Sequence, residues 1–407
     1  MYKKDESKNK SDRGKAEDVN TERKGKNRKG VCPVADRCGG CQYQGVSYQE
    51  QLERKQTIVR KLLKPLAPVE AIQGMEEPLH YRNKVHAVFS FTRKHEIISG
   101  IYEENSHRVV PVKSCMIENE GADVIIQDIR AMLPSFKIKV YDEDTGYGLF
   151  RHVLIRTGHY TGQVLVVLVL ASPILPSRGN FVKALVEKHP EITSIVINVN
   201  DKRTSMVLGD KETVIYGKGY IEDRIGDCIF RISPRSFYQV NPVQTQNLYA
   251  KALELAELTG KERVIDAYCG TGTIGILASE HAKEVIGVEL NKDAVRDAIT
   301  NAKVNGRKNI WFYQKDAGEF LVQMAEQGEK ADVIIMDPPR AGSSEAFIKS
   351  IGILAPVRVV YVSCNPETLA RDVRLLKKQG YMPEQFWPFD MFPYTEHVET
   401  VVRLIRR

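Results

Sequence analysis

Five short apolar segments, each followed by a helix-like stretch, recur through the C-terminal half of the chain and constrain its fold. The segments are ERVIDAY, EVIGVEL, NIWFYQKDA, ADVIIMDPP and RVVYVSCNP, and we expect each to form a buried strand. The last helical stretch, NPETLARDVRLLKKQG, begins with Asn and ends with Gly, which are common helix caps. This alternation predicts an α/β domain with a doubly wound parallel sheet, which binds ligands at the carboxyl ends of its strands.

Periodicity and composition divide the rest of the chain. Residues 80–218 contain short apolar or alternating runs such as KVHAVFSF and QVLVVLVLA, which predict a strand-rich middle domain. Residues 31–79 combine a cysteine-bearing loop with a helix-like stretch, SYQEQLERKQTIVRKLLKPL, that Pro65 and Pro68 end. The alternating domain occupies residues 219–407. With 42% hydrophobic residues, the 407-residue chain can form more than one core.

The charge of the chain is concentrated at its beginning. Residues 1–30 hold eleven Lys or Arg and six Asp or Glu, so +5 of the formal net charge of +7 lies there. A segment with so few apolar residues cannot bury enough surface to fold, and we predict a disordered basic arm. Such an arm either contacts nucleic-acid phosphates or only improves solubility.

Neither a membrane span nor a secretion signal is expected. The longest apolar run, Val164 to Ala171, is far shorter than the ~20 residues that a bilayer requires. The N-terminus has no apolar core of the kind found in signal peptides. We therefore expect a cytoplasmic protein.

The turn after the first strand of the alternating domain is typical of nucleotide-like cofactors. Gly270, Gly272 and Gly275 form G-x-G-x-x-G between a strand and a helix, and Glu289 ends the next strand. Two further strands end at Asp316 and Asp337. Carboxylates at these positions could accept hydrogen bonds from a ribose, from an adenine amino group and from a substrate. This pattern favours S-adenosylmethionine as the cofactor, and NAD is the alternative. Asp316 could equally serve only as a helix cap.

A cysteine stands at the end of the fifth strand. Cys364 lies between RVVYV and a helix, where the helix N-terminus favours a thiolate. Beside a methyl donor, a thiolate that adds to C6 of uracil would activate C5 for methylation. A carboxylate must then remove the C5 proton, and the sequence weakly prefers Glu399 over Glu396. Cys228 and Cys269 are expected to be inert core thiols.

Four other cysteines form a candidate metal site. Cys32, Cys38 and Cys41 fall in CPVADRCGGC, and Cys115 follows in VPVKSCMIEN. Four thiolates can hold either a structural zinc or an iron–sulfur cluster. Their spacing alone leaves both open.

Together these motifs resemble the RNA (uracil-5-)-methyltransferase family, in particular its iron–sulfur branch that modifies 23S ribosomal RNA. The resemblance covers about residues 31–407 and rests on CPVADRCGGC with Cys115, SFYQVNP, DAYCGTGTIG, GVE, MDPPR, VSCNP and HVETVV. It implies a Rossmann-like class I methyltransferase domain, S-adenosylmethionine as cofactor, and a [4Fe-4S] cluster in an N-terminal iron–sulfur segment. The cluster ligands would be Cys32, Cys38, Cys41 and Cys115.

The same resemblance assigns roles within the alternating domain. Cys364 corresponds to the nucleophile and Glu399 to the proton acceptor. S-adenosylmethionine would be bound by Gln239, Tyr268, Glu289 and Asp337. Without the resemblance, Gln239 in SFYQVNP would pass for an ordinary loop residue.

The implied substrate is a uridine of 23S ribosomal RNA, converted to 5-methyluridine. The T-loop uridine of tRNA is an alternative substrate, and a non-catalytic ribosome-assembly factor that binds RNA is an alternative of another class. Many ribosomal RNA members begin with a small β-barrel, whereas this sequence begins with the basic arm, which puts the target nucleotide in doubt. No protein partner is implied. Expected RNA contacts are Phe237, Tyr238, Arg340 and, from charge alone, Arg151, His152 and Arg156.

Overall fold

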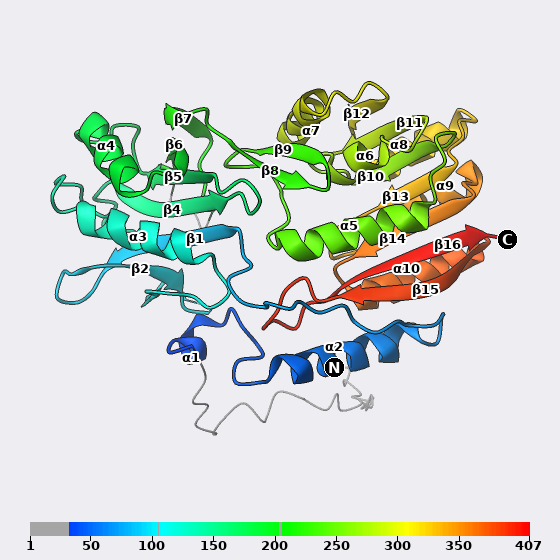
Figure 1. The fold of residues 1–407 in the computed structure, drawn as a ribbon, viewed down its shortest axis with the longest axis horizontal. Helices are drawn as coiled ribbons and strands as arrows, with labels where there is room; N and C mark the ends of the chain where they lie inside the picture. The colour runs from blue at the N-terminus through cyan, green and yellow to red at the C-terminus, as the bar shows by residue number, and fades with distance from the viewer. Residues whose placement is uncertain (1–31, 105, 203–205) are drawn as a thin grey trace, which may run out of the picture.

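The computed structural model describes residues 32–104, 106–202 and 206–407, and it contains two seven-stranded sheets, one on each side of Figure 1. The predicted basic arm, residues 1–30, lies outside the described residues. No helix in the described part of the chain combines the length and the apolarity that a membrane span requires.

The C-terminal sheet has the α/β architecture predicted from the alternating segments. Its order is β12-β11-β10-β13-β14-β16-β15, in which the first five strands run parallel and β16 runs antiparallel to both of its neighbours. The strands are β10 (Arg263–Ala267), β11 (Glu284–Glu289), β12 (Ile310–Gln314), β13 (Val333–Met336), β14 (Arg358–Ser363), β15 (Tyr381–Phe389) and β16 (Glu399–Arg406). This is a Rossmann-like fold, with its topological switch beside β10.

Helices bury both faces of this sheet in two separate cores. One core includes residues of α5 and α6, and the other includes residues of α8, α9 and α10. The helices are α5 (Pro242–Ala256), α6 (Thr273–Ala278), α7 (Lys292–Val304), α8 (Ala317–Glu326), α9 (Glu345–Leu354) and α10 (Pro366–Lys378). The predicted caps of α10 are confirmed, because the Asn365 side chain accepts from the Glu367 amide and Gly380 has a φ of 87°.

Two edge strands differ from the expectation. β12 was expected to be buried, but only one of its five residues is, because it lies at the edge of the sheet. β15 was not predicted at all, since Pro383 and Pro388 interrupt its pattern. Proline is tolerated in β15 because this strand forms the opposite edge.

The middle sheet confirms the strand-rich expectation. Its order is β3-β2-β1-β4-β5-β6-β7, and α3 and α4 contribute to the core on one face. The elements are β1 (Lys84–Phe91), β2 (Ile97–Tyr102), β3 (Val109–Pro111), α3 (Glu120–Met132), β4 (Phe150–Thr157), β5 (Val164–Leu170), α4 (Arg178–Lys188), β6 (Ile192–Val199) and β7 (Lys211–Gly217). A hairpin, β8 (Ile221–Ile225) and β9 (Cys228–Ile232), joins a core that is shared by both sheets.

The N-terminal segment packs against the C-terminal sheet. It contains the short helix α1 (Ala35–Cys38) and α2 (Tyr48–Leu63), which contacts α10 and β15. Beyond α2, the chain forms bridges with β15 at Phe386 and Phe389. Lys55 of α2 donates to Asp390 at 2.5 Å, and both side chains are completely buried. This ion pair joins segments 335 residues apart in the sequence.

The phosphate contacts inferred from charge alone are wrong. Arg151, His152 and Arg156 are only 2–3% exposed, and the two arginines donate to backbone carbonyls of neighbouring loops. Guanidinium groups tolerate this burial because those carbonyls satisfy several of their donors. Tyr238 is also buried, whereas Phe237 is 65% exposed and stays available to RNA.

Replacing Lys55 tests how strongly the N-terminal segment supports the fold. The Lys55→Ala variant leaves the Asp390 carboxylate buried without its partner, so the free energy of unfolding should fall by about 3–5 kcal/mol. Urea titration followed by circular dichroism measures this change. Lys61→Ala, on the exposed side of the same helix, is the control and should change stability little. Equal stability of the two variants would show that the buried pair contributes nothing.

Candidate functional site

A large cleft opens at the carboxyl ends of the parallel strands, where the sequence placed the ligands. Its volume is about 1280 Å³, and residues from the N-terminal segment, the middle sheet and the C-terminal sheet line it. All six residues expected to bind cofactor or to catalyse line this one cleft: Cys364, Glu399, Gln239, Tyr268, Glu289 and Asp337.

The glycine loop borders the cleft and is held in an unusual conformation. Tyr268, Gly270 and Gly272 all have positive φ values, of 64°, 54° and 79°. A Cβ at Gly272 would lie 2.9 Å from the ring of Phe312, while a Cβ at Gly270 would meet nothing within 4 Å. Gly272 is therefore required by packing, and Gly270 lets a ligand approach the backbone. Tyr268 carries backbone strain of the kind found at ligand sites.

Carboxylates fix this loop from two sides. Glu289 accepts from the Gly270 amide at 3.1 Å and from the Asn291 amide at 2.7 Å. Asp266, which the sequence reading missed, accepts from the Gly275 amide at 2.7 Å beneath the loop. Burial raises the pKa of Asp266 to about 8. Its only signal in the sequence is a polar residue inside an apolar strand, ERVIDAY.

The remaining predicted cofactor residues are held by neighbours. Tyr268 donates its hydroxyl to Ser343 at 3.3 Å. The backbone carbonyl of Gln239 accepts from Asn83 at 3.1 Å. Asp316 lines the cleft and also caps α8, since it accepts from the Glu319 amide at 3.1 Å. The cap and the ligand roles considered for Asp316 are therefore compatible.

Cys364 follows β14 and precedes α10, as expected, but its surroundings do not favour a thiolate. The pKa of Cys364 is raised to about 11, mainly by burial, with the carboxylates of Glu399 and Asp337 acting in the same direction and Arg340 in the opposite one. The helix N-terminus was expected to favour the thiolate, but the pKa is raised overall because burial and the two neighbouring carboxylates act in the opposite direction.

Glu399 and Asp337 form a pair of carboxyl groups beside the cysteine. Glu399 is 4% exposed, and burial together with the charge of Asp337 raises its pKa. Burial also raises the pKa of Asp337. Glu396, the other candidate base, is exposed and does not line the cleft. The structure therefore favours Glu399 as the carboxylate that acts in the cleft.

Arg340 is the cation nearest to this group. Its guanidinium lies 2.7 Å from Nδ1 of His397, and its backbone carbonyl accepts from Thr368 at 3.1 Å. Arg82, Lys84 and Arg235 bring further positive charge to the cleft walls. The sequence reading missed these three, because each stands alone in a segment with no motif.

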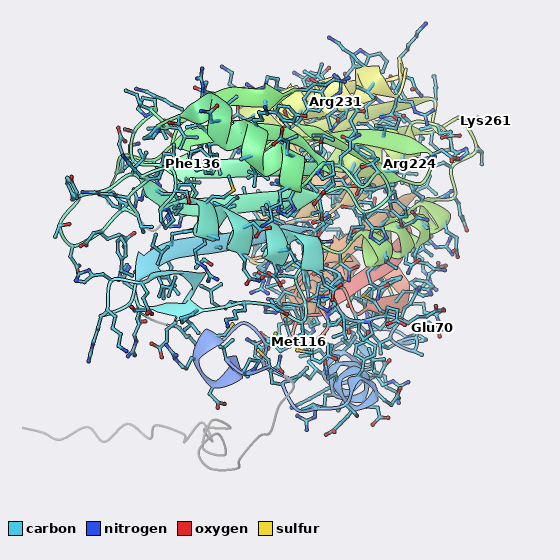
Figure 2. The ribbon with its side chains drawn as sticks, turned by 60° about the vertical axis from the view of Figure 1, so that its left-hand side comes forward. Glu70, Met116, Phe136, Arg224, Arg231 and Lys261 are labelled. Carbon is cyan, nitrogen blue, oxygen red and sulfur yellow. The ribbon has the colours of Figure 1, made fainter. Side chains whose placement is uncertain are left out.

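The four cysteines expected to bind metal come from segments that contact each other. Cys41 lies near Cys38 and Cys32, whose charges help burial to raise its pKa to about 11. Gln44 contacts the sulfur of Met116, next to Cys115, at 3.1 Å, and Figure 2 shows Met116 close to the N-terminal helices. Within the described ranges, no three His, Cys, Asp or Glu side chains are arranged to hold a metal ion.

The fold, the glycine loop and the cleft define a Rossmann-like domain that binds a nucleotide-like cofactor at the carboxyl ends of its strands. Residues 47–407 match the profile of the tRNA (uracil-5-)-methyltransferase family, and the chain belongs to that family. It is thus an RNA methyltransferase of the uracil-C5 class, and the family supports S-adenosylmethionine as its cofactor.

Relatives and a solved structure agree with this assignment. An uncharacterised RNA methyltransferase of Halalkalibacterium halodurans is 46% identical over 92% of this chain and 82% of its own length. One of Caldanaerobacter subterraneus is 45% identical, over 92% of this chain and 84% of its own. The tRNA (uracil-54, C5)-methyltransferase of Pyrococcus abyssi, solved with S-adenosyl-L-homocysteine, is 30% identical with a TM-score of 0.76, covering 90% of this chain and 86% of that one.

Alkylation of Cys364 tests the electrostatics of the cleft. A raised pKa means that the protonated thiol dominates at neutral pH, so the thiolate fraction grows as the pH rises towards about 11. The rate of iodoacetamide labelling, followed by peptide mass spectrometry, should therefore still increase above about pH 9, where an ordinary cysteine is already mostly ionised. Glu399→Gln should shift the profile to lower pH and Arg340→Gln to higher pH. A plateau near pH 7 would contradict this account.

Proposed function

We propose that this protein methylates C5 of a specific uridine in RNA through a covalent bond between Cys364 and C6 of the uracil. The proposal rests on one observation: Cys364, Glu399 and Asp337 line the same cleft as the glycine loop. A purely binding protein does not need a thiol beside two carboxyl groups with raised pKa values. This argues against the non-catalytic assembly factor.

The reaction begins at Cys364. The thiol gives its proton to solvent water, the positive charge of Arg340 stabilises the thiolate, and the sulfur then adds to C6 of the uracil. This addition makes C5 electron-rich. S-adenosylmethionine, when bound, supplies the methyl group that C5 attacks. Glu399 then removes the C5 proton, and the electrons of that C–H bond restore the C5–C6 double bond as sulfur leaves.

The burial of Glu399 suits the last step. A carboxylate that is hard to keep ionised binds a proton more tightly than an exposed one, which makes it the stronger base. Asp337 strengthens this effect by its charge. Gln239, Tyr268, Glu289 and Asp337 would hold the cofactor, with Gly270 open to the ligand at the loop. The uracil must leave its base stack to reach this group, so a loop in the RNA is the expected target.

We favour a uridine of 23S ribosomal RNA as the target, on the strength of the CPVADRCGGC motif and the other segments shared with the branch that modifies it. The tRNA T-loop uridine is the second candidate. It is supported by the resemblance to the Pyrococcus abyssi enzyme that acts on uracil 54 of tRNA.

We further propose that Cys32, Cys38, Cys41 and Cys115 hold a [4Fe-4S] cluster with a structural role. The contact between Gln44 and Met116 supports this, because it brings the first three cysteines towards the fourth. The four thiolates would join the N-terminal segment to the middle domain.

Variants of Cys364 and Glu399 test the covalent mechanism. RNA from a strain that lacks the gene, complemented with each variant, is mapped for 5-methyluridine by mass spectrometry. Cys364→Ala should abolish the modification, because among the described residues no other thiol lines the cleft. Glu399→Gln should trap a protein–RNA adduct, visible as a slowly migrating band on a denaturing gel, since the C5 proton stays in place.

Glu396→Gln is the matched control, because Glu396 is exposed and lies outside the cleft. It should methylate normally and form no lasting adduct. Normal methylation by Cys364→Ala would exclude the covalent route. If the unchanged protein restored 5-methyluridine only in tRNA, the tRNA T-loop uridine would replace 23S ribosomal RNA as the proposed substrate.

Iron analysis tests the cluster. Protein purified without oxygen should be brown and contain about four irons per chain. Cys115→Ser should lose iron and also stability, because the fourth ligand holds two segments together. Cys228→Ala, a buried cysteine outside the set, should retain all of the iron. A colourless protein with one zinc per chain would overturn the cluster.

A further inference from the structure

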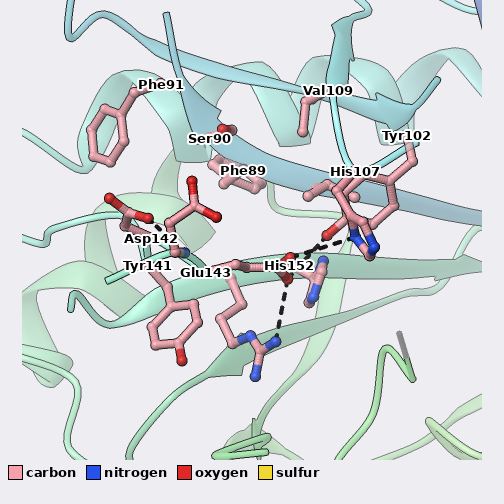
Figure 3. Close-up of a pocket in the computed structure, with 13 residues that line it drawn as sticks. Phe89, Ser90, Phe91, Tyr102, His107, Val109, Tyr141, Asp142, Glu143 and His152 are labelled. Atoms are coloured by element: carbon pink, nitrogen blue, oxygen red, sulfur yellow. Dashed lines mark hydrogen bonds and ion pairs between the residues drawn. The ribbon is translucent and has the colours of Figure 1, made fainter. Parts of the chain in front are cut away.

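A second cavity lies beside β1, β2 and β4 of the middle sheet, and none of the described residues that line it also lines the catalytic cleft. Its volume is about 290 Å³, which exceeds the size of a nucleobase, and Figure 3 shows the side chains around it. Ser90 of β1, Tyr102 of β2, Tyr141, Glu143 and His152 of β4 are among the residues that line it.

Two strands connect this cavity with the catalytic cleft. Lys84 lines the cleft and pairs with Arg156, whereas Val88 and His152 pair with each other and line the second cavity. Residues two apart on a strand share a face, so Lys84 and Val88 lie on the same face of β1. Val88 is the fourth residue after Lys84, a distance of about 13 Å along the strand.

The cavity is built from aromatic rings around a carboxylate. Glu143 accepts from the Tyr102 hydroxyl at 3.1 Å and from Arg151 at 3.4 Å, and His107 lies 3.8 Å from it. Figure 3 shows these interactions converging on Glu143. Arg151 in turn stacks over the ring of Tyr141, 4.6 Å from its centre. Asp142 and Asp144 add negative charge at the opening.

Two buried nitrogen atoms here have no partner. His152 is 3% exposed, and its Nδ1 makes no hydrogen bond within the described residues. The same holds for Nε of Arg151, which is 2% exposed. Burial lowers the pKa of His152 to about 2, so its ring is neutral and offers one donor and one acceptor. Both side chains line the cavity, and a group bound there could supply the missing partners.

We propose that this cavity binds a second unstacked nucleobase of the RNA substrate, one that carries an exocyclic amino group. The inference rests on the proposed function, because it assumes that RNA enters the neighbouring cleft. Aromatic rings give a base its stacking surface, and carboxylates accept from amino groups on its edge. Uracil has no amino group to donate. The negative charges of Asp142, Glu143 and Asp144 repel phosphate, so the base rather than the backbone enters.

Crosslinking tests the site without relying on methylation. The full chain is mixed with total RNA from a strain lacking the gene and irradiated at 254 nm, and the crosslinked peptides are identified by mass spectrometry. Peptides that contain Tyr102 or Tyr141 should carry adenosine, cytidine or guanosine. Crosslinks confined to peptides of the catalytic cleft, or uridine on these two peptides, would overturn the proposal. The crosslinking result does not depend on methylation. If the Cys364 experiment contradicted the proposed function, the crosslinks would still show whether a base occupies this cavity, so each proposal can be overturned independently of the other.

Two substitutions test the contribution of the cavity to turnover. Ser90→Phe fills it, and Tyr141→Ala removes one of its stacking surfaces. Each should raise the KM for RNA about 10-fold, a typical effect of losing one base–aromatic stack. The kcat value and the binding of S-adenosylmethionine should not change, which shows that the fold is intact.

Tyr216→Ala is the matched control, because Tyr216 is a partly exposed aromatic residue on β7 of the same sheet and lies outside the cavity. It should leave the KM unchanged. An unchanged KM in both cavity variants would also overturn the proposal.

Discussion

The buried ion pair between Lys55 and Asp390 is the contact on which the arrangement of the cleft depends. Asp390 begins the loop that carries Phe392, Thr395 and His397 into the cleft and then enters β16 at Glu399. The same loop is held by Gln51, which accepts from the Tyr394 amide, and by the Tyr43 amide, which donates to the Tyr394 carbonyl. These partners all belong to the N-terminal segment. Breaking a fully buried ion pair costs much free energy, so the N-terminal segment and the loop that begins at Asp390 are held in a fixed relative position.

Charge is distributed unevenly within the cleft. Cys364, Asp337 and Glu399 each become harder to ionise because all three develop negative charge and all are shielded from water. Arg340 opposes this, but a single cation is shared between the thiol and the Glu399 carboxylate. The free protein therefore holds Cys364 mainly as a thiol. Under the proposed mechanism, this protects the sulfur in the absence of substrate, and Arg340 sets the reactivity of Cys364.

Local patterns predicted much of the fold and most of the site, because both depend on short segments. The glycine loop, Glu289, Asp337 and Cys364 follow apolar strands directly, and parallel strands must bring their carboxyl ends to one edge. Contacts between distant segments were not predictable in this way. Lys55 looks like one more charge on an amphipathic helix, and only the tertiary structure supplies Asp390. Arg151 and Arg156 were misread because sequence shows the charge of a side chain but not the carbonyls that will surround it.

The middle sheet provides one wall of the catalytic cleft through Lys84, and β1 continues from there to the second cavity. Because the strand is a rigid element within a seven-stranded sheet, the distance between the two sites is set by the backbone and not by flexible side chains. An RNA with the target uridine in the cleft and a neighbouring base in the cavity must match that spacing. The distance between two unstacked bases can thus determine which uridine is selected, although the second cavity does not contact the reacting carbon. This selection distinguishes RNA loops by their shape, which suits an RNA in which many uridines are chemically identical.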